Sequence, residues 1–161
     1  MPVLTEVSWV IDPDRVEHRM PLDGIGHPRA DQGPDTARFV SAPTVRGVDL
    51  LGPVSFRAVA QADSAGSRLT VTLSDVAPDG RTVVLMTGEH PCRPGRDRVR
   101  LDLGVLSYRL ERGHAIRLDL HGVPGDAGGT ILRHRVSIGG MDGAHLALVV
   151  RDQPWTGVDV D

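Results

Sequence analysis

Hydrophobic and polar residues alternate most clearly along residues 69–88. Leu69, Val71 and Leu73 are separated by threonine residues, and this period of two predicts a strand with one buried face. The string P-D-G at residues 78–80 follows, and its proline and glycine suit a tight reversal of the chain. An apolar run that ends in T-G comes next. The pattern predicts a β-hairpin whose first strand buries Leu69, Val71 and Leu73.

The same alternation recurs later in the chain. Residues 98–103 alternate strictly, and within residues 114–121 we expect Ile116, Leu118 and Leu120 to face the core. Other apolar segments that read as strands are residues 3–11, 47–62, 131–138 and 144–150. Seven to nine strands with turn signals between them, and no convincing helical period, predict an all-β sandwich of two antiparallel sheets.

Residues 12–43 break this regularity, because prolines and glycines interrupt every short apolar run, and we expect no element of regular structure there. We expect this segment to fold back over the sandwich, held by apolar anchors such as Phe39, and to be a place of partner contact. The sequence therefore predicts an N-terminal arm and wrapping segment over residues 1–46 and a β-sandwich over residues 47–161, within one structural domain.

Composition narrows the function classes. A chain of 161 residues can bury about two-thirds of its unfolded surface, so its core needs no metal or disulfide to be stable. The single cysteine, Cys92, excludes an internal disulfide and suits a reducing compartment; without a visible leader segment, the expected location is the cytoplasm. A net charge of −3 and an aromatic content of 3% argue against nucleic acid as a partner, and no apolar run suggests a membrane.

Several strings resemble one known family. The hairpin contains D-V-A-P-D-G-R, residues 35–44 read D-T-A-R-F-V-S-A-P-T, and residues 108–120 read Y-R-L-E-R-G-H-A-I-R-L-D-L. Two further strings are V-D-L-L-G-P-V at residues 48–54 and W-V-I-D-P at residues 9–13. Together, these strings resemble the C-terminal jelly-roll domain of the X-prolyl dipeptidyl-peptidase and cocaine-esterase group of serine hydrolases. The resemblance implies a jelly roll like the galactose-binding domains. In that family the domain is not catalytic; it packs on an α/β-hydrolase module and helps to shape the active-site entrance.

The chain shows no candidate catalytic or metal site. The nucleophile elbow G-x-S-x-G of the α/β-hydrolases does not occur, and Ser64, Ser67 and Ser137 lie in turn or strand contexts that do not suit a nucleophile. His90 and Cys92 are two residues apart but lack the second pair of ligands that a zinc site needs. The scattered aspartates do not form a calcium loop. We expect no catalytic residue, no metal and no cofactor.

One row of polar residues could form a ligand or partner surface. If Ile116 and its alternate neighbours point inward, Arg117, Asp119 and His121 line the outer face. The residues that could join them from other strands are Arg57, Thr70, Thr72 and Arg133. Arginine forks in such a row could hold an anionic ligand or contact a partner. The plainer alternative is a solvated outer face.

Two functions remain open at this stage, and so does the question of whether the chain is an enzyme. In the first, the chain is an accessory domain of a hydrolase. In the second, it is a free-standing β-sandwich that binds a small apolar metabolite, or promotes its isomerisation or cyclisation in secondary metabolism by positioning alone. The oligomeric state is open as well.

Overall fold

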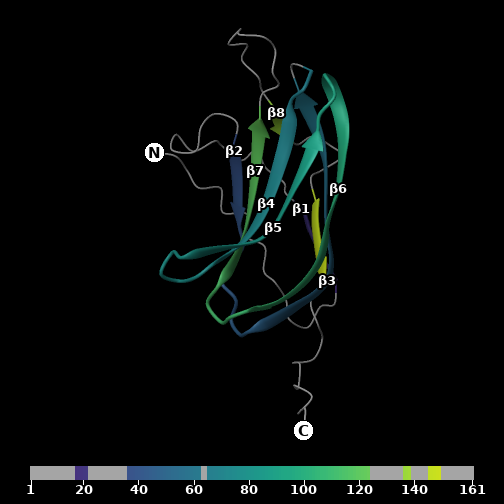
Figure 1. The fold of residues 1–161 in the computed structure, drawn as a ribbon. Helices are drawn as coiled ribbons and strands as arrows, with labels where there is room; N and C mark the ends of the chain where they lie inside the picture. The colour runs from purple at the N-terminus through teal and green to yellow at the C-terminus, as the bar shows by residue number, and fades with distance from the viewer. Residues whose placement is uncertain (1–16, 22–35, 63–64, 124–135, 139–144, 150–161) are drawn as a thin grey trace.

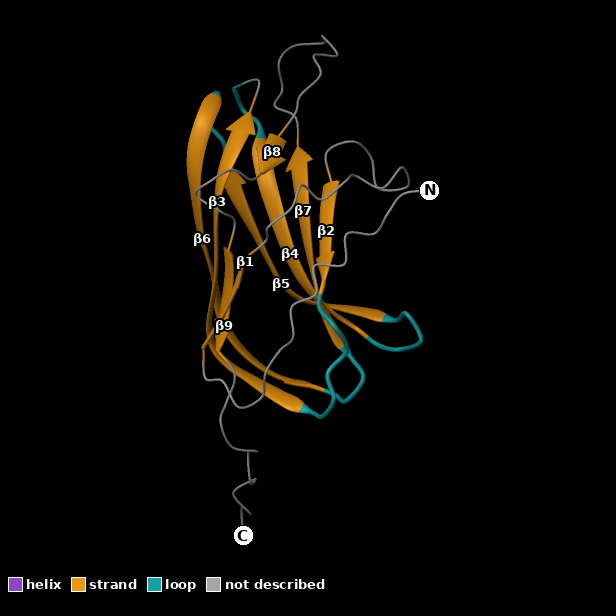
Figure 2. Cartoon of the chain, turned by 180° about the vertical axis from the view of Figure 1, so that it is seen from behind, coloured by secondary structure: helices purple, strands orange, loops and turns teal. Residues whose placement is uncertain are grey.

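The computed structural model of the chain describes residues 17–21, 36–62, 65–123, 136–138 and 145–149. Nine strands in these ranges form two antiparallel sheets that face each other (Figures 1 and 2). The prediction of an all-β sandwich with seven to nine strands is confirmed. Within the same ranges, no helix is long and apolar enough to cross a membrane.

The first sheet, called here the β3–β6 sheet, has the order β1-β9-β3-β6, and β8 also pairs with β3. Its strands are β1 (Glu17–Pro21), β3 (Val48–Ala62), β6 (Gly95–Leu110), β8 (Val136–Ile138) and β9 (His145–Val149). β3 lies in the interior of this sheet, between β9 and β6, whereas β6 is an edge strand.

The second sheet, the β4–β7 sheet, has the order β2-β7-β4-β5. Its strands are β2 (Thr36–Val40), β4 (Arg68–Val76), β5 (Thr82–Pro91) and β7 (Ala115–Val123). The edge strand β5 comes close to the edge strand β6 of the other sheet, since a Cβ on Gly88 would lie 2.6 Å from the Leu103 side chain. The two sheets therefore meet along a seam between β5 and β6.

The core lies between the sheets and consists of the residues that the alternation predicts. At most 1% of the surface is exposed for each of the predicted inward residues Leu69, Val71, Leu73, Ile116, Leu118 and Leu120. Phe56, Leu50 and Leu110 meet them from the β3–β6 sheet and are equally buried. Burying one such side chain contributes about 1.5 to 3 kcal/mol relative to leaving it in water.

The predicted reversal between β4 and β5 is confirmed. Gly80 has a φ of 86°, which glycine adopts without strain, and its amide donates to the Ala77 carbonyl at 2.9 Å. The Ala77 amide donates to the Arg81 carbonyl at 2.8 Å, which closes the loop. The Asp79 carboxylate accepts the Arg81 amide at 3.0 Å, and this bond holds the pKa of the Asp79 carboxyl below its usual value.

The expectation that residues 12–43 contain no element of regular structure was wrong. β1 pairs with β9 and β2 pairs with β7, so each extends one sheet at its edge. β2 is short but alternates as a half-buried strand should, with Phe39 buried against the core and Arg38 facing outward. The expected strand at residues 3–11 lies outside the described residues.

Candidate functional site

The predicted polar row on β7 exists as a set of outward side chains. Antiparallel pairing places Ser74 of β4 opposite Arg117, Thr72 opposite Asp119 and Thr70 opposite His121. Arg117 and Asp119 are half-buried and His121 is exposed. The two threonines expected on this face are therefore present there.

The structure does not bring the other two predicted residues to this row. Arg57 lies on β3, in the opposite sheet, and its side chain is exposed on the far outer face of the sandwich. The expectation that it joins Arg117 was therefore wrong, because alternation shows which residues share a face of a strand but not which sheet the strand enters. Arg133 lies outside the described residues.

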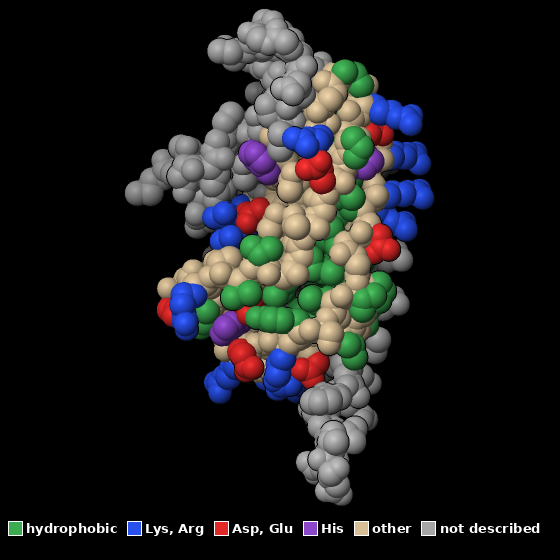
Figure 3. Space-filling view, in the orientation of Figure 1, with side chains coloured by type: hydrophobic (Ala, Val, Ile, Leu, Met, Phe, Trp, Pro, Cys, Tyr) green, Lys and Arg blue, Asp and Glu red, His purple; other side chains and the backbone are tan. Residues whose placement is uncertain are grey.

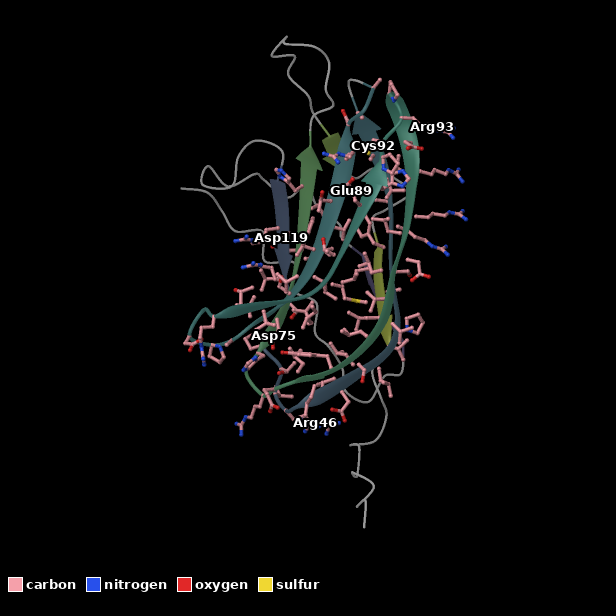
Figure 4. All side chains as sticks on the ribbon, in the orientation of Figure 1. Arg46, Asp75, Glu89, Cys92, Arg93 and Asp119 are labelled. Carbon is pink, nitrogen blue, oxygen red and sulfur yellow. The ribbon has the colours of Figure 1, made fainter. Side chains whose placement is uncertain are left out.

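Arg38 joins the row instead. It lies on β2 directly opposite Asp119, and its Nε is 2.6 Å from Asp119 Oδ1. On the other side, Arg117 Nε lies 2.9 Å from Asp119 Oδ2 as an ion pair without hydrogen-bond geometry. One carboxylate thus holds two guanidinium groups. Asp119 is labelled in Figure 4. The alternation of T-A-R-F-V, with Phe39 inward, is the signal that could have placed Arg38 here.

A second polar cluster lies at one end of the sandwich, around Asp75 (Figure 4). The Asp75 side chain is only 5% exposed, yet both carboxylate oxygens have partners. Oδ2 accepts a hydrogen bond from the Tyr108 hydroxyl at 2.7 Å, and Oδ1 lies 2.8 Å from Nδ1 of His114. A buried carboxylate is tolerated only with such partners, so the three side chains stabilise one another.

The Asp75 cluster changes the pKa of the Tyr108 hydroxyl. The hydrogen bond to Asp75, with partial burial and the negative charges of Asp75 and Glu111, raises the pKa of Tyr108 to about 12. A carboxylate that orients an imidazole through Nδ1 resembles two members of a catalytic triad, but the hydroxyl on this carboxylate belongs to a tyrosine. The arrangement fixes side chains from both sheets, and the raised pKa keeps the Tyr108 hydroxyl protonated.

His90 and Cys92 do not form a pair of ligands. His90 Nε2 lies 3.2 Å from Asp97 Oδ2, which also accepts the Arg93 amide at 3.2 Å. This amide bond, helped by His90, lowers the pKa of Asp97, whereas burial raises the pKa of the Cys92 thiol. No group of three or more metal-binding side chains occurs in the described part of the chain.

Several large apolar side chains are exposed on the described part of the chain. Val83 and Val84 on β5 are 53% and 61% exposed, and Val105 and Leu51 on the β3–β6 sheet are 74% and 43% exposed. The partly buried Met86 lies where β5 meets β6, since its Cε is 3.5 Å from where a Cβ on Gly104 would be, next to Val105. Figure 3 shows hydrophobic side chains gathered across the lower half of the molecule, over the region where Figure 1 places β5 and β6. We call Leu51, Val83, Val84, Met86 and Val105 the apolar patch.

The two antiparallel sheets that face each other define the class of protein, a jelly-roll β-sandwich. The family model of the X-Pro dipeptidyl-peptidase C-terminal non-catalytic domain matches residues 8–128. The chain belongs to this family. A sequence comparison with characterised proteins finds no match.

Three solved structures that share this fold are hydrolases. An α-amino acid ester hydrolase is 16% identical with a TM-score of 0.62, over 75% of this chain and 26% of its own. An aminopeptidase from a marine sediment archaeon of the Thaumarchaeota is 14% identical with a TM-score of 0.62, over 79% and 27%. A CocE/NonD family hydrolase from Staphylococcus aureus is 9% identical with a TM-score of 0.56, over 84% and 33%. The chain thus spans about a third or less of these enzymes, and at such identities the likeness shows the fold alone.

Proposed function

We propose that this chain is the accessory jelly-roll domain of an X-prolyl dipeptidyl-peptidase or cocaine-esterase-like hydrolase, and that it packs on an α/β-hydrolase module beside the active site. The observation that carries the proposal is the family match over residues 8–128, whose model describes a non-catalytic domain. The hydrolase module is carried on the same polypeptide or on a separate one.

The apolar patch is the surface that suits this contact. Soluble proteins seldom expose a continuous group of large apolar side chains, and such groups mark interfaces. β5 shows this most clearly, because its apolar run V-V-L-M would be expected in a core, yet Val83 and Val84 face solvent. Moving these side chains from water into an interface would contribute to association in proportion to the area buried.

The row around Asp119 remains a second proposal for partner contact. Asp119 already forms ion pairs with both Arg38 and Arg117, so these arginines have a carboxylate partner within the chain. The outer face of the β4–β7 sheet would therefore add orientation to an interface more than affinity. Val84 pairs with Ser74, the residue opposite Arg117, so it lies beside this row. Variants at Arg117 and at Val105, which lies on the other sheet, separate the two surfaces.

The test compares the α/β-hydrolase module encoded with this chain in the presence and absence of the chain. We expect the chain to raise the melting temperature of the module and its kcat/KM on X-prolyl anilides or p-nitrophenyl esters, and we expect the chain alone to be inactive. A module whose stability and activity do not respond to the chain would contradict the proposal. Hydrolysis by the purified chain alone, abolished by a serine-directed reagent, would contradict its non-catalytic part.

A further inference from the structure

The outer face of the β3–β6 sheet carries a row of arginines. Even-numbered residues of β3 such as Phe56 and Ala58 are buried, so the odd-numbered Arg57 points outward. The strand register places Arg57 opposite Arg100 of β6, and Arg98 lies on the next outward position of that strand. We call these three exposed residues the arginine ladder. A row of basic side chains projects along the β6 side of the molecule in Figure 3.

The charges of the arginine ladder are not compensated. Within the described part of the chain, Arg57, Arg98 and Arg100 have no hydrogen bond and no ion pair. The next outward carboxylate on β6 is Asp102, and its Oδ1 accepts the Gly104 amide at 3.0 Å. Other arginines contrast with the ladder: Arg38, Arg68 and Arg109 lie 2.6, 3.2 and 2.8 Å from carboxylate oxygens.

Folding stability does not account for the arginine ladder. Like charges directly opposite each other on neighbouring antiparallel strands destabilise a sheet, and Arg57 faces Arg100 in this way. Charged side chains on edge strands do discourage sheets from pairing edge to edge, which would explain Arg98 and Arg100 on β6. Arg57 has no such explanation, because β3 is an interior strand.

The same face continues into apolar side chains. Moving along the sheet from the Arg57 and Arg100 pair, the next outward pairs are Ser55 with Asp102 and Pro53 with Val105, followed by Leu51 opposite Ser107. Val105 and Leu51 belong to the apolar patch. A dry apolar centre beside charged groups is typical of protein–protein interfaces. The ladder is therefore continuous with the surface assigned above to the hydrolase module.

We infer that the arginine ladder docks a carboxylate-rich surface of the α/β-hydrolase module, and this inference rests on the proposed function. Guanidinium groups bind carboxylates through two parallel hydrogen bonds, and alternate residues of a strand repeat about every 6.5 to 7 Å. A row of aspartates or glutamates at a similar spacing would match the arginine ladder. A phosphate polymer fits less well, because the chain has a net charge of −3 and an aromatic content of 3%.

The experiment measures binding of the hydrolase module to four forms of the chain at low and high salt. They are the wild type, Arg98→Glu/Arg100→Glu, the milder Arg98→Gln/Arg100→Gln, and the control Arg112→Glu, which changes an exposed arginine in the turn before β7. We expect the glutamate pair to weaken binding at least tenfold at low salt, the glutamine pair to weaken it less, and Arg112→Glu to change it less than twofold. The difference between wild type and the double variants should shrink at high salt, since salt screens exposed charges. Variants whose melting temperatures are no lower than that of the wild type are correctly folded. If the glutamate double variant does not fold, the glutamine double variant provides the test.

The outcomes separate the two proposals. If the module binds every form equally, the ladder inference is overturned while the proposed function stands. Equal weakening by Arg112→Glu would also overturn it, because net charge alone would then explain the loss. If the wild type does not bind the module, the proposed function and the hydrolase as occupant both fail. In that case the arginine ladder is tested with two labelled probes, a peptide with glutamate at every second position and a single-stranded oligonucleotide. Tighter binding of the oligonucleotide would overturn the choice of carboxylates as the ligand.

Discussion

The Tyr108 hydroxyl donates a 2.7 Å hydrogen bond to Oδ2 of Asp75, and this bond connects the two sheets of the sandwich. Tyr108 lies on β6 of the β3–β6 sheet, and Asp75 lies on β4 of the other sheet. The same carboxylate holds His114, which precedes β7. The strings D-V-A-P-D-G-R and Y-R-L-E-R-G-H, which carry the family resemblance, therefore meet at Asp75.

Replacing Tyr108 by phenylalanine should destabilise the fold by about 1.5 to 3 kcal/mol, the range for a hydrogen bond to a charged group. The ring and its packing are kept, while Asp75 loses one partner in a buried position. Urea unfolding followed by circular dichroism measures the change in the free energy of unfolding. An unchanged midpoint would mean that solvent replaces the hydroxyl and that the bond contributes little.

Alkaline pH should weaken the same contact. The pKa of Tyr108 is about 12 in the folded state and close to 10 when the chain is unfolded. The folded state therefore holds this proton more tightly, so the contribution is complete below about pH 10 and is lost as pH rises through 12. Tyr108 is the only tyrosine in the chain, so near-ultraviolet absorbance reports its ionisation directly.

The control for this titration is Asp75→Asn, which keeps the shape of the side chain but removes its charge. In that variant the Tyr108 pKa should fall toward 10, provided that the protein remains folded in the titration range. A wild-type tyrosine that titrates near 10 while the far-ultraviolet spectrum still shows a folded sheet would contradict the geometry.

The thiol of Cys92 should react slowly in the native protein. It is buried, burial raises its pKa, and the nearby Asp97 adds to that effect, so little of the reactive thiolate forms at neutral pH. A disulfide reagent added in excess should modify Cys92 at a rate limited by opening of the structure and should modify the urea-unfolded chain at once. Equal rates in both states would show that the seam near β5 is open.

Arg117→Ala should leave the free energy of unfolding within about 1 kcal/mol of wild type, because Asp119 keeps its bond to Arg38 and partly exposed ion pairs contribute little. Its effect on binding to the hydrolase module shows whether the outer face of the β4–β7 sheet takes part in the interface. A loss of binding in proportion to a loss of stability would assign Arg117 a structural role only.

Much of the fold could be predicted from alternation, since the period of two identifies buried faces directly. Leu69 on β4 and Leu118 on β7 are core residues as expected, and the P-D-G turn forms as its residue types require. The strands β1 and β2 were missed because they are short, begin or end beside prolines and glycines, and gain their stability by pairing with β9 and β7. Pairing between distant segments leaves little trace in a single sequence.

The candidate sites were harder to predict for the same reason. Continuing the alternation of Leu69, Val71 and Leu73 by one step would have placed Asp75 inward, but its partners Tyr108 and His114 lie more than thirty positions away. Arg57 was assigned to the wrong sheet because alternation carries no information on strand order. The exposure of Val84 could not be foreseen either, since an apolar run on an edge strand looks like a buried strand.

The central claim is that the apolar patch binds an α/β-hydrolase module, and the most direct measurement is the dissociation constant of this complex by sedimentation velocity for three forms of the chain. The forms are the wild type, Val84→Thr/Val105→Thr, and Val45→Thr, a control at an exposed valine in the loop before β3. Threonine keeps the shape and strand propensity of valine while adding a hydroxyl that must be desolvated. We predict that the double variant weakens binding at least tenfold and that Val45→Thr changes it less than twofold. A double variant that binds as tightly as the wild type would contradict the account.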